Sequence, residues 1–170
     1  MSRRIVAFDL SPEDIDRAIS EIERFSSDFI KACDELIKQL TRMAKDTALD
    51  WLSILVEEPR TKELEKSVAN GEKFDPRTRT GILRTECPYA AFVEFGTGIE
   101  GKNSPHPVAE EFGWKHDYKE HGDEGWYYYN PNDAKVHWTR GQPAKPFMFR
   151  AAMTVWLRAK DMTVHIFTAL

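Results

Sequence analysis

The sequence has few cysteines and no excess of basic residues, and each shortage excludes a class of protein. Its two cysteines, Cys33 and Cys87, form no C-x-x-C pair, so neither a disulfide scaffold nor a zinc knuckle is indicated. Acidic residues outnumber basic ones by 28 to 24, for a formal net charge of -4, whereas nucleic-acid binders usually present a basic face. We therefore expect no sequence-specific binding of nucleic acid.

Long apolar runs are also missing. No segment approaches the roughly 18 apolar residues of a membrane span, and the apolar run near the N-terminus is too short for the core of a signal peptide. Apolar residues still make up 41% of the 170 residues, and aromatic residues 12%, which excludes a disordered chain. We expect a soluble intracellular protein that folds as a single domain over residues 1–170.

The first third of the chain lacks helix breakers. Between Pro12 and Pro59 there is neither glycine nor another proline, and the start Ser11-Pro12-Glu13-Asp14 is typical of a helix N-terminus. Apolar residues then recur every three or four positions from Ile15 to Leu55, which is the pattern of one helix face. Residues 1–58 are therefore predicted to be mainly helical, with one long amphipathic helix.

A helix of this length raises a geometric problem. About 45 residues would span ~65 Å, whereas a compact domain of this size has a radius of gyration of roughly 15 Å. One solution is a break at Ser26-Ser27, where the side chains compete for backbone hydrogen bonds. The other is a helix that projects from the domain and needs a partner to cover its apolar stripe. The sequence leaves both solutions open.

After Pro59 the pattern changes and predicts two β-hairpins. Residues 67–74 and 78–87 flank the turn Asp75-Pro76-Arg77, which places the first hairpin in the region 59–97. Residues 125–129 and 134–138 flank a second turn, which places the other hairpin in the region 126–170. We expect the hairpins to form a small antiparallel sheet. Between them, Pro88–Phe95 is an apolar segment compatible with a two-turn helix or a strand.

Two further segments complete the expected α+β fold. Residues 98–125 are rich in glycine and charge, which predicts a long loop, and such loops are usually functional or flexible. Pro146 is expected to open an amphipathic C-terminal helix. Phe147 and Met148 would pack that helix on the sheet, and Pro143 would limit the conformations of the approach to it.

The stretch Phe92–Ser104, FVEFGTGIEGKNS, fits both G-x-G-x-x-G and G-x-x-x-x-G-K. A phosphate loop requires a helix after the glycines, whose amides hold the phosphate, but Pro105 and Pro107 follow too early for one. A Walker-type loop also requires Ser or Thr after its lysine, where this chain has Asn103. We therefore expect no nucleotide and no other cofactor.

A glycine-rich turn explains the same stretch more simply. Gly96 and Gly98 would adopt positive φ in a tight turn that follows Glu94. Glu94 would then be a partly buried carboxylate that fixes the loop by accepting hydrogen bonds from its amides.

Two catalytic alternatives depend on single clusters. His116, Asp117, His121 and Asp123 have the ligand chemistry of zinc or manganese, but their spacing matches no established pattern. We prefer a solvated polar loop and expect no metal, although a metal-dependent enzyme stays open. Cys87 paired with a histidine also stays open, while the G-x-S-x-G of a serine hydrolase is absent. We expect no catalytic residues.

The aromatic run Trp126-Tyr127-Tyr128-Tyr129 and Trp138 lie on the second predicted hairpin. Such residues can stack on nucleic-acid bases, which would make the hairpin a binding module. Because the net charge is negative and few basic residues are interleaved, sheet core and interface are the preferred interpretations.

Several segments occur in an order that resembles one known family. They are Pro59–Val68, similar to P-x-T-G-x-L-x-x-S-I; Pro88–Gly98, similar to P-Y-A-x-x-V-E-F-G-T-G; His106-Pro107; Gly125–Tyr128; and Thr139–Met148, similar to T-x-G-x-P-A-x-P-F-M. The set resembles the gene-product-ten-like family of HK-ninety-seven-type phages, which are small head–tail connector or tail-completion proteins. The resemblance covers about residues 30–160. Lys62 stands where the family has glycine, so that turn is expected to differ.

The resemblance implies an α+β fold without catalysis, in which a long helix and a C-terminal helix pack a small antiparallel sheet. It implies a homo-oligomeric ring of six or twelve copies in the virion of a long-tailed phage or prophage, assembled in the host cytoplasm. Its partners would be portal or adaptor proteins of the head and a tail-tube or tail-terminator protein, with DNA passing through the ring. The loop at 98–125 would become ordered against a neighbouring copy. We assign loop-fixing or interface roles to Glu94, Gly96, Thr97, Gly98, His106, Trp126, Gly141, Pro143, Pro146 and Phe147.

Overall fold

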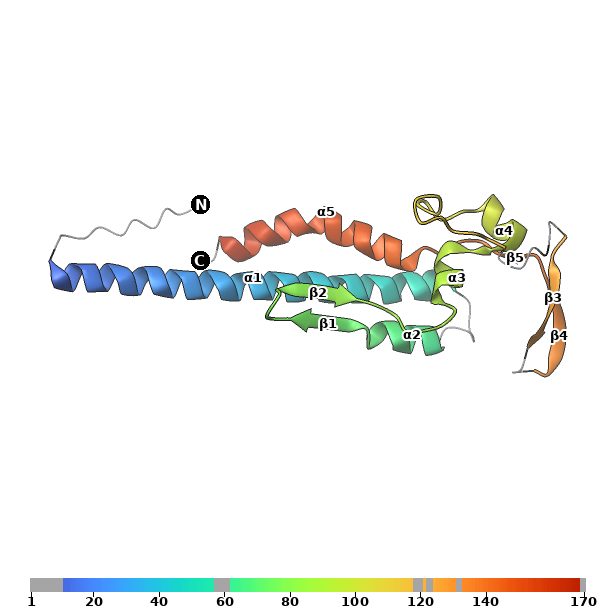
Figure 1. Ribbon diagram of the computed structural model, residues 1–170, viewed down its shortest axis with the longest axis horizontal. Helices are drawn as coiled ribbons and strands as arrows, with labels where there is room; N and C mark the ends of the chain where they lie inside the picture. The colour runs from blue at the N-terminus through green and yellow to red at the C-terminus, as the bar shows by residue number, and fades with distance from the viewer. Residues whose placement is uncertain (1–10, 57–61, 118–120, 122–123, 131–132, 169–170) are drawn as a thin grey trace.

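The computed structural model describes residues 11–56, 62–117, 121, 124–130 and 133–168. It shows an elongated α+β molecule in which helix α1 (Pro12–Leu55) runs along most of the length (Figure 1). Helix α5 (Phe147–Phe167) lies beside the C-terminal half of α1. The predicted fold class, with a long N-terminal helix, two hairpins and a C-terminal helix, is confirmed. Within the described ranges, no helix is long and apolar enough to cross a membrane.

Helix α1 begins as predicted and does not break. The Ser11 hydroxyl oxygen accepts a hydrogen bond from the Asp14 amide at 3.2 Å, with Pro12 in the first turn. The helix continues through Ser26-Ser27, so the break considered there is wrong. Serine costs a helix only a few tenths of a kcal/mol relative to alanine, and the neighbouring Phe25 and Phe29 rings pack 6.3 Å apart on the same face.

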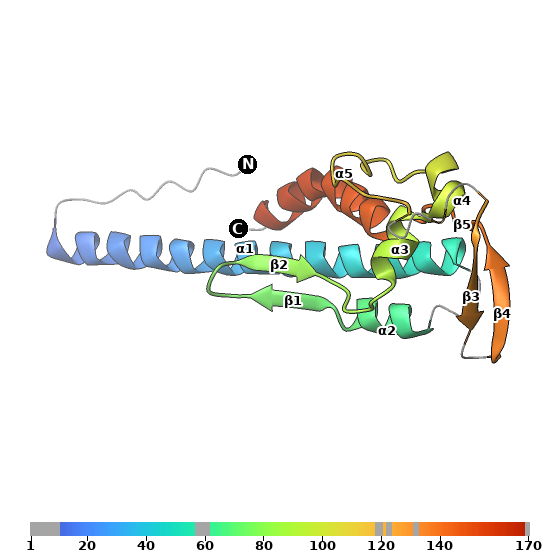
Figure 2. The ribbon, with the colours of Figure 1, turned by 45° about the vertical axis from the view of Figure 1, so that its right-hand side comes forward.

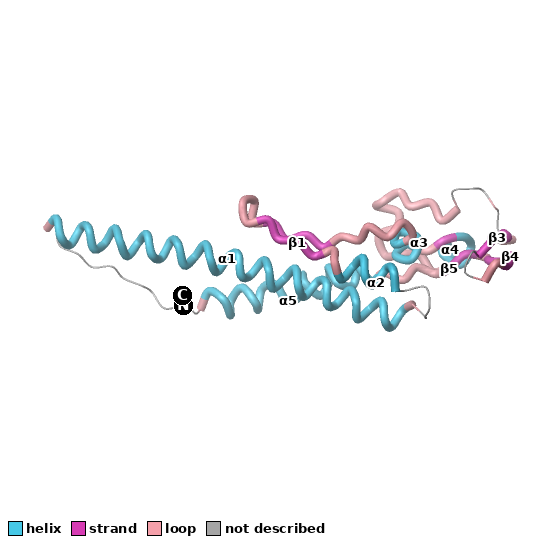
Figure 3. Tube along the Cα trace, turned by 90° about the horizontal axis from the view of Figure 1, so that it is seen from below, coloured by secondary structure: helices cyan, strands magenta, loops and turns pink. Residues whose placement is uncertain are grey.

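The N-terminal part of α1 projects beyond the rest of the fold. Helix α5 ends opposite Phe29, whose ring lies 5.2 Å from that of Phe167. Residues 12–28 extend past this point by about 25 Å at 1.5 Å per residue, as seen from below in Figure 3. The projecting helix, the second of the two alternatives, is therefore the one that the structure adopts.

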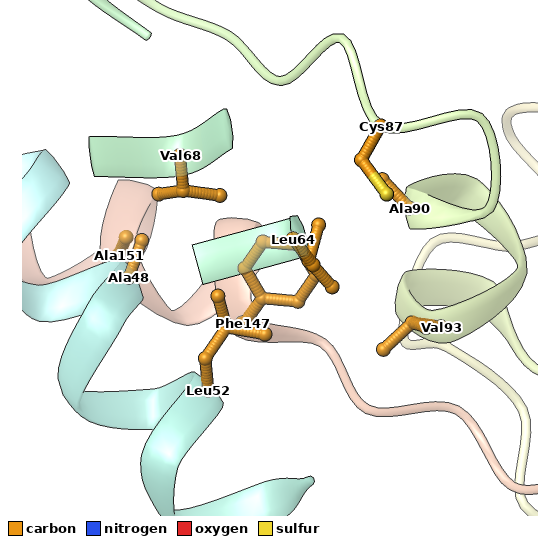
Figure 4. Close-up of a cluster of buried hydrophobic side chains, with 9 residues drawn as sticks. All are labelled: Ala48, Leu52, Leu64, Val68, Cys87, Ala90, Val93, Phe147 and Ala151. Atoms are coloured by element: carbon orange, nitrogen blue, oxygen red, sulfur yellow. The ribbon is translucent and has the colours of Figure 1, made fainter. Parts of the chain in front are cut away.

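The hydrophobic core lies around the C-terminal half of α1 (Figure 4). Its fully buried members come from three helices and include Leu52 of α1, Leu64 and Val68 of α2 (Lys62–Ala69), and Phe147 of α5. Phe147 thus packs against helices rather than on a sheet, which corrects the expectation. At this point the N-terminus of α5 is fixed against α1 and α2.

Helix α2 replaces part of the predicted first hairpin. Residues 67–69 were expected to be strand but form its last turn. Leu64 and Val68 are four residues apart and both buried, which is helical rather than strand spacing. Pro59, which opens the family-like segment here, lies outside the described residues. Lys62, where that segment departs from the family, is the first residue of the helix.

The first hairpin is shorter than predicted and lies on α1. Strands β1 (Glu72–Asp75) and β2 (Thr80–Leu83) are antiparallel, with Asp75 opposite Thr80. A Cβ atom at Gly81 would overlap the Thr41 hydroxyl of α1. The glycine that weakens the strand pattern is therefore what allows the strand to approach the helix.

The second hairpin forms where it was predicted but as a separate sheet. Strands β3 (Trp126–Asn130) and β4 (Lys135–Thr139) pair with each other at the end of the molecule opposite the projecting part of α1 (Figure 2). The two hairpins do not join, so each is a two-stranded sheet.

Short elements connect the hairpins to the helices. Pro88–Phe95, which was compatible with helix or strand, contains helix α3 (Ala90–Phe95). The expected loop at 98–125 begins with helix α4 (Gly98–Asn103), and the two-residue strand β5 (Gly141–Gln142) lies beside it. The described part of the loop thus has contacts within its own chain, and its ordering against a neighbouring copy stays a prediction.

Candidate functional site

Glu94, in α3, is the central residue of the family-like segments. Its side chain is buried, with only 9% exposed. The carboxylate accepts the backbone N–H groups of Met148 and Phe149, each at 2.9 Å. These are the second and third residues of α5, whose N-cap residue, Pro146, provides no side-chain cap. Glu94 was expected to fix the loop that follows it, but it caps a helix that begins 53 residues later.

His106 completes the polar cluster. Its Nε2 lies 3.1 Å from a Glu94 carboxylate oxygen, and its Nδ1 accepts the Val108 amide at 3.2 Å. This arrangement assigns the proton to Nε2, which donates to Glu94. The His106 side chain is 2% exposed, so both ring nitrogens are used inside the fold.

Aromatic rings surround this pair. The His106 ring lies 4.3 Å from Phe95 and 5.1 Å from Phe149. Trp114 stacks on Phe95 at 5.0 Å and donates its indole N–H to the Gly96 carbonyl at 3.0 Å. These contacts fix the described part of the 98–125 segment to α3 and α5.

The glycines of the motif allow two backbone segments to meet. Gly96, Gly98 and Gly141 all have positive φ, and Thr97 and Gly98 bridge Gln142 and Gly141 respectively in antiparallel fashion. A Cβ atom at Gly141 would overlap the Thr97 carbonyl oxygen. We call the structure formed by residues 94–106 and 139–149 the junction. The expected positive φ at Gly96 and Gly98 is confirmed.

The amides of the glycine motif are already used. Gly98 N–H donates to the His116 carbonyl at 2.7 Å, and Glu100 N–H donates to the Arg140 carbonyl at 3.3 Å. A phosphate loop needs such amides free to face the ligand. The motif therefore builds a junction between backbone segments and does not form a phosphate cradle.

The remaining expected site residues lie at the edges of the junction. Pro143 sits against Gly96, and Pro146 precedes the first turn of α5. The ring of Trp126 packs on Gly98 and stacks with His121 at 4.6 Å. All ten residues to which we assigned loop-fixing or interface roles thus lie in or against the junction, although their roles there are internal.

A shallow apolar groove of about 580 Å³ lies beside the junction. Cys87 lines it together with His106, but the histidine has committed both nitrogens elsewhere and does not serve as a base. Burial, followed by interaction with the Cys87 thiol, raises the pKa of the neighbouring Tyr89 to about 12. The groove therefore offers apolar surface, and its described residues include no activated nucleophile.

The proposed metal cluster is not assembled among the described residues. No three His, Cys, Asp or Glu side chains gather there in a way that could hold an ion. Asp117 pairs with His121 at 2.9 Å, while Nε2 of His116 is buried without a hydrogen-bond partner. Burial, and then the charge of Lys102, lower the pKa of His116. Asp123 lies outside the described residues.

The second hairpin presents an exposed apolar face. In its register Tyr127 lies opposite Trp138, and Tyr129 opposite Val136, so all four side chains share one face. All four are exposed, and the rings of Tyr127 and Trp138 pack 4.8 Å apart. The interpretation of this run as sheet core is wrong for this face, because no second layer covers it in the described chain.

Comparisons with protein-family models, curated proteins and solved structures found no match to this chain.

Replacing Glu94 tests the cap. Glu94→Gln leaves one acceptor oxygen where the carboxylate has two, and it removes the negative charge at the N-terminus of α5. We expect the free energy of unfolding to fall by about 1–3 kcal/mol, measured by urea denaturation. Glu111→Gln, at an exposed position, should change it by less than about 0.5 kcal/mol. Equal effects of the two substitutions would contradict the assigned role.

Substitutions at two glycines distinguish the free-energy cost of backbone strain from that of steric overlap. Gly113 and Gly141 both have positive φ, but a Cβ atom at Gly113 would meet nothing within 4 Å. Gly113→Ala should cost about 1–2 kcal/mol of unfolding free energy from conformation alone. Gly141→Ala should cost a further 1–3 kcal/mol, roughly, because the methyl group displaces Thr97. Similar losses in thermal or urea unfolding would show that the close approach is not constrained.

Proposed function

We propose that this chain is a non-enzymatic virion structural protein that assembles as a homo-oligomeric ring at the head–tail junction of a long-tailed phage or prophage. The observation that carries the proposal is the projecting part of α1, where Ile19, Ile22 and Phe25 are exposed and no described segment packs on them. The resemblance of the junction segments to the gene-product-ten-like family gives the assembly its context.

The projecting helix is poorly suited to a solitary molecule. Isolated helices of this length are marginally stable in water, and most helical stability in proteins comes from packing an apolar face. Ile19, Ile22 and Phe25 are exposed there, with 60% of Ile22 accessible. Contiguous exposed apolar surface marks interaction sites. Assembly with other copies would cover this stripe.

The junction supports a structural role over a catalytic one. Its buried polar groups are paired with one another: Glu94 with the amides of α5 and with His106, and His106 with the Val108 amide. A catalytic group must reach a substrate proton or atom, whereas these groups hold three parts of the chain in place. The family-like segments around Glu94, His106 and Phe147 are thus joined into one unit that can present interaction surfaces.

The proposal extends to partners. In the ring, one end of the molecule would face portal or adaptor proteins of the head, and the other the tail-tube or tail-terminator protein. The two ends differ in chemistry, one being the projecting helix and the other the aromatic hairpin (Figure 1). Two unlike ends suit a protein placed between two unlike neighbours.

Native mass spectrometry over a range of protein concentrations tests the proposal. We expect metal-free oligomers whose population rises with concentration and which include a closed ring of six or twelve copies. A monomer carrying one tightly held zinc or manganese ion would contradict it and favour the His116, Asp117 and His121 alternative. A chain that remains monomeric at every concentration would contradict self-assembly.

The exposed hairpin face favours a second candidate, a binding module that stacks nucleic-acid bases on Tyr127, Tyr129 and Trp138. Aromatic residues on an exposed two-stranded sheet are suited to such stacking. The hairpin would then act without any ring.

Oligonucleotide binding distinguishes the two candidates. Fluorescence anisotropy measures the binding of a single-stranded oligonucleotide. Under the ring proposal, we expect no binding that both depends on Trp138 and weakens as the salt concentration rises. Salt-sensitive binding that is lost in Trp138→Ser would support the binding module. The matched control is Phe112→Ser, because Phe112 is also a highly exposed aromatic residue and lies outside the hairpin.

A further inference from the structure

We propose that the projecting stripe of α1 docks on the outer face of α5 in a neighbouring copy of this chain. This inference rests on the proposed self-assembly and names the two surfaces that meet. The projecting stripe is defined as Ile15, Ile19, Ile22 and Phe25, all exposed. The outer face is defined as Met153, Trp156, Leu157 and Val164, also all exposed.

The projecting stripe continues a surface that already binds an α5 helix. Its residues follow at steps of three and four, which keep them on one side of a helix. Further along the same side, α1 packs against its own α5, as the ring contact between Phe29 and Phe167 shows. Beyond Phe29 this surface stays exposed at Ile15, Ile19, Ile22 and Phe25, although Ala18 among them is buried. A second α5 helix is the occupant that this surface already accepts elsewhere.

Helix α5 carries apolar residues outside the side that it buries. Phe147 and Ala151 lie on the inner side, buried against α1. At 100° per residue, Trp156 lies about 160° and Leu157 about 100° around the helix from the middle of that side, and they are 77% and 69% exposed. A helix that is apolar all round is normally buried all round. The outer face therefore indicates a second layer, which none of the segments that the structure describes provides.

The two surfaces match in length. The stripe from Ile15 to Phe25 spans about 15 Å along α1, and Met153 to Val164 spans about 16 Å along α5, at 1.5 Å per residue. The shorter face fits within the longer one. Side chains at steps of three and four on both helices provide the ridges and grooves by which helices pack.

The surfaces are complementary in charge. Residues 12–30 of α1 hold six acidic and two basic side chains, whereas α5 holds three basic and one acidic. Lys160 lies four residues from both Trp156 and Val164 and thus on the outer face. Two projecting stripes paired with each other would bring like charges together, and so would two outer faces. The charges therefore favour α1 against α5 over either self-pairing.

In the proposed contact the stripe of one copy meets the outer face of a second copy, whose own stripe meets a third, so the contact is heterologous. Each copy offers one stripe and one outer face, so each can bind two neighbours and the assembly either closes into a ring or grows as a filament. An isologous contact would instead stop at a dimer. The pairing thus explains how a single kind of contact would build the proposed ring.

Two variants, each broken at one surface, test the pairing. Ile22→Glu places a charge in the projecting stripe, and Trp156→Glu places one in the outer face. Ile54→Glu is the matched control, since Ile54 lies on α1, is 68% exposed and belongs to neither surface. Urea denaturation confirms that each variant is folded. Native mass spectrometry and sedimentation velocity then compare each variant alone and the two mixed in equal amounts.

We expect the self-association constant of each of the two variants to be at least roughly thirty-fold lower than that of wild type. The control Ile54→Glu should assemble like wild type. The mixture should form a 1:1 heterodimer and nothing larger, because only the stripe of Trp156→Glu and the outer face of Ile22→Glu remain intact. The two variants differ in mass, so the composition of the dimer can be read directly.

Other outcomes overturn the pairing. If either variant still assembles like wild type, that surface is not part of the contact, and the ring must form through another face such as the aromatic hairpin. If the mixture gives no heterodimer, the two surfaces do not meet. In both cases, if the wild-type chain assembles, the proposed function is not contradicted. A wild-type chain that stays monomeric up to about 1 mM overturns the pairing and self-assembly together.

Discussion

The fold is built around the hydrogen bonds that the Glu94 carboxylate accepts. Helix α5 starts after a proline that supplies no cap, so its first amides need an acceptor from elsewhere, and Glu94 supplies it. The same carboxylate holds His106, which carries the segment after α4 into the aromatic cluster. Because unpaired buried polar groups are costly, three distant parts of the chain are held in one arrangement.

The position of α5 then determines which surfaces remain free. Phe147, directly before the capped amides, is locked into the core between α1 and α2, and α5 runs back along α1 from there. It reaches only as far as Phe29, so the length of one helix determines how much of the other is left uncovered. The exposed stripe, the outer face of α5 and the separate aromatic hairpin are therefore consequences of a single fixed helix start.

Local patterns in the sequence predicted the parts of this architecture that local physics controls. Ser11 and Pro12 marked the start of α1, and the turn after Asn130 marked the second hairpin. Helix α2 was missed because its two buried residues, Leu64 and Val68, make a signal only one turn long beside a strand-like run. The capping role of Glu94 leaves no periodic trace, since its partners lie 54 and 55 residues away. The one available clue was Pro146, which begins a helix that it does not cap.

The order of synthesis delays the formation of the Glu94 cap. Its acceptor is made before the amides that it binds, because α5 follows all the other described elements along the chain. At roughly 5–20 residues per second, about 5–20 s separate the synthesis of Leu52 from that of Phe147. For that interval the nascent chain carries the whole apolar side of α1 without α5. During that time the apolar side of α1 is open to molecular chaperones that shield apolar helices.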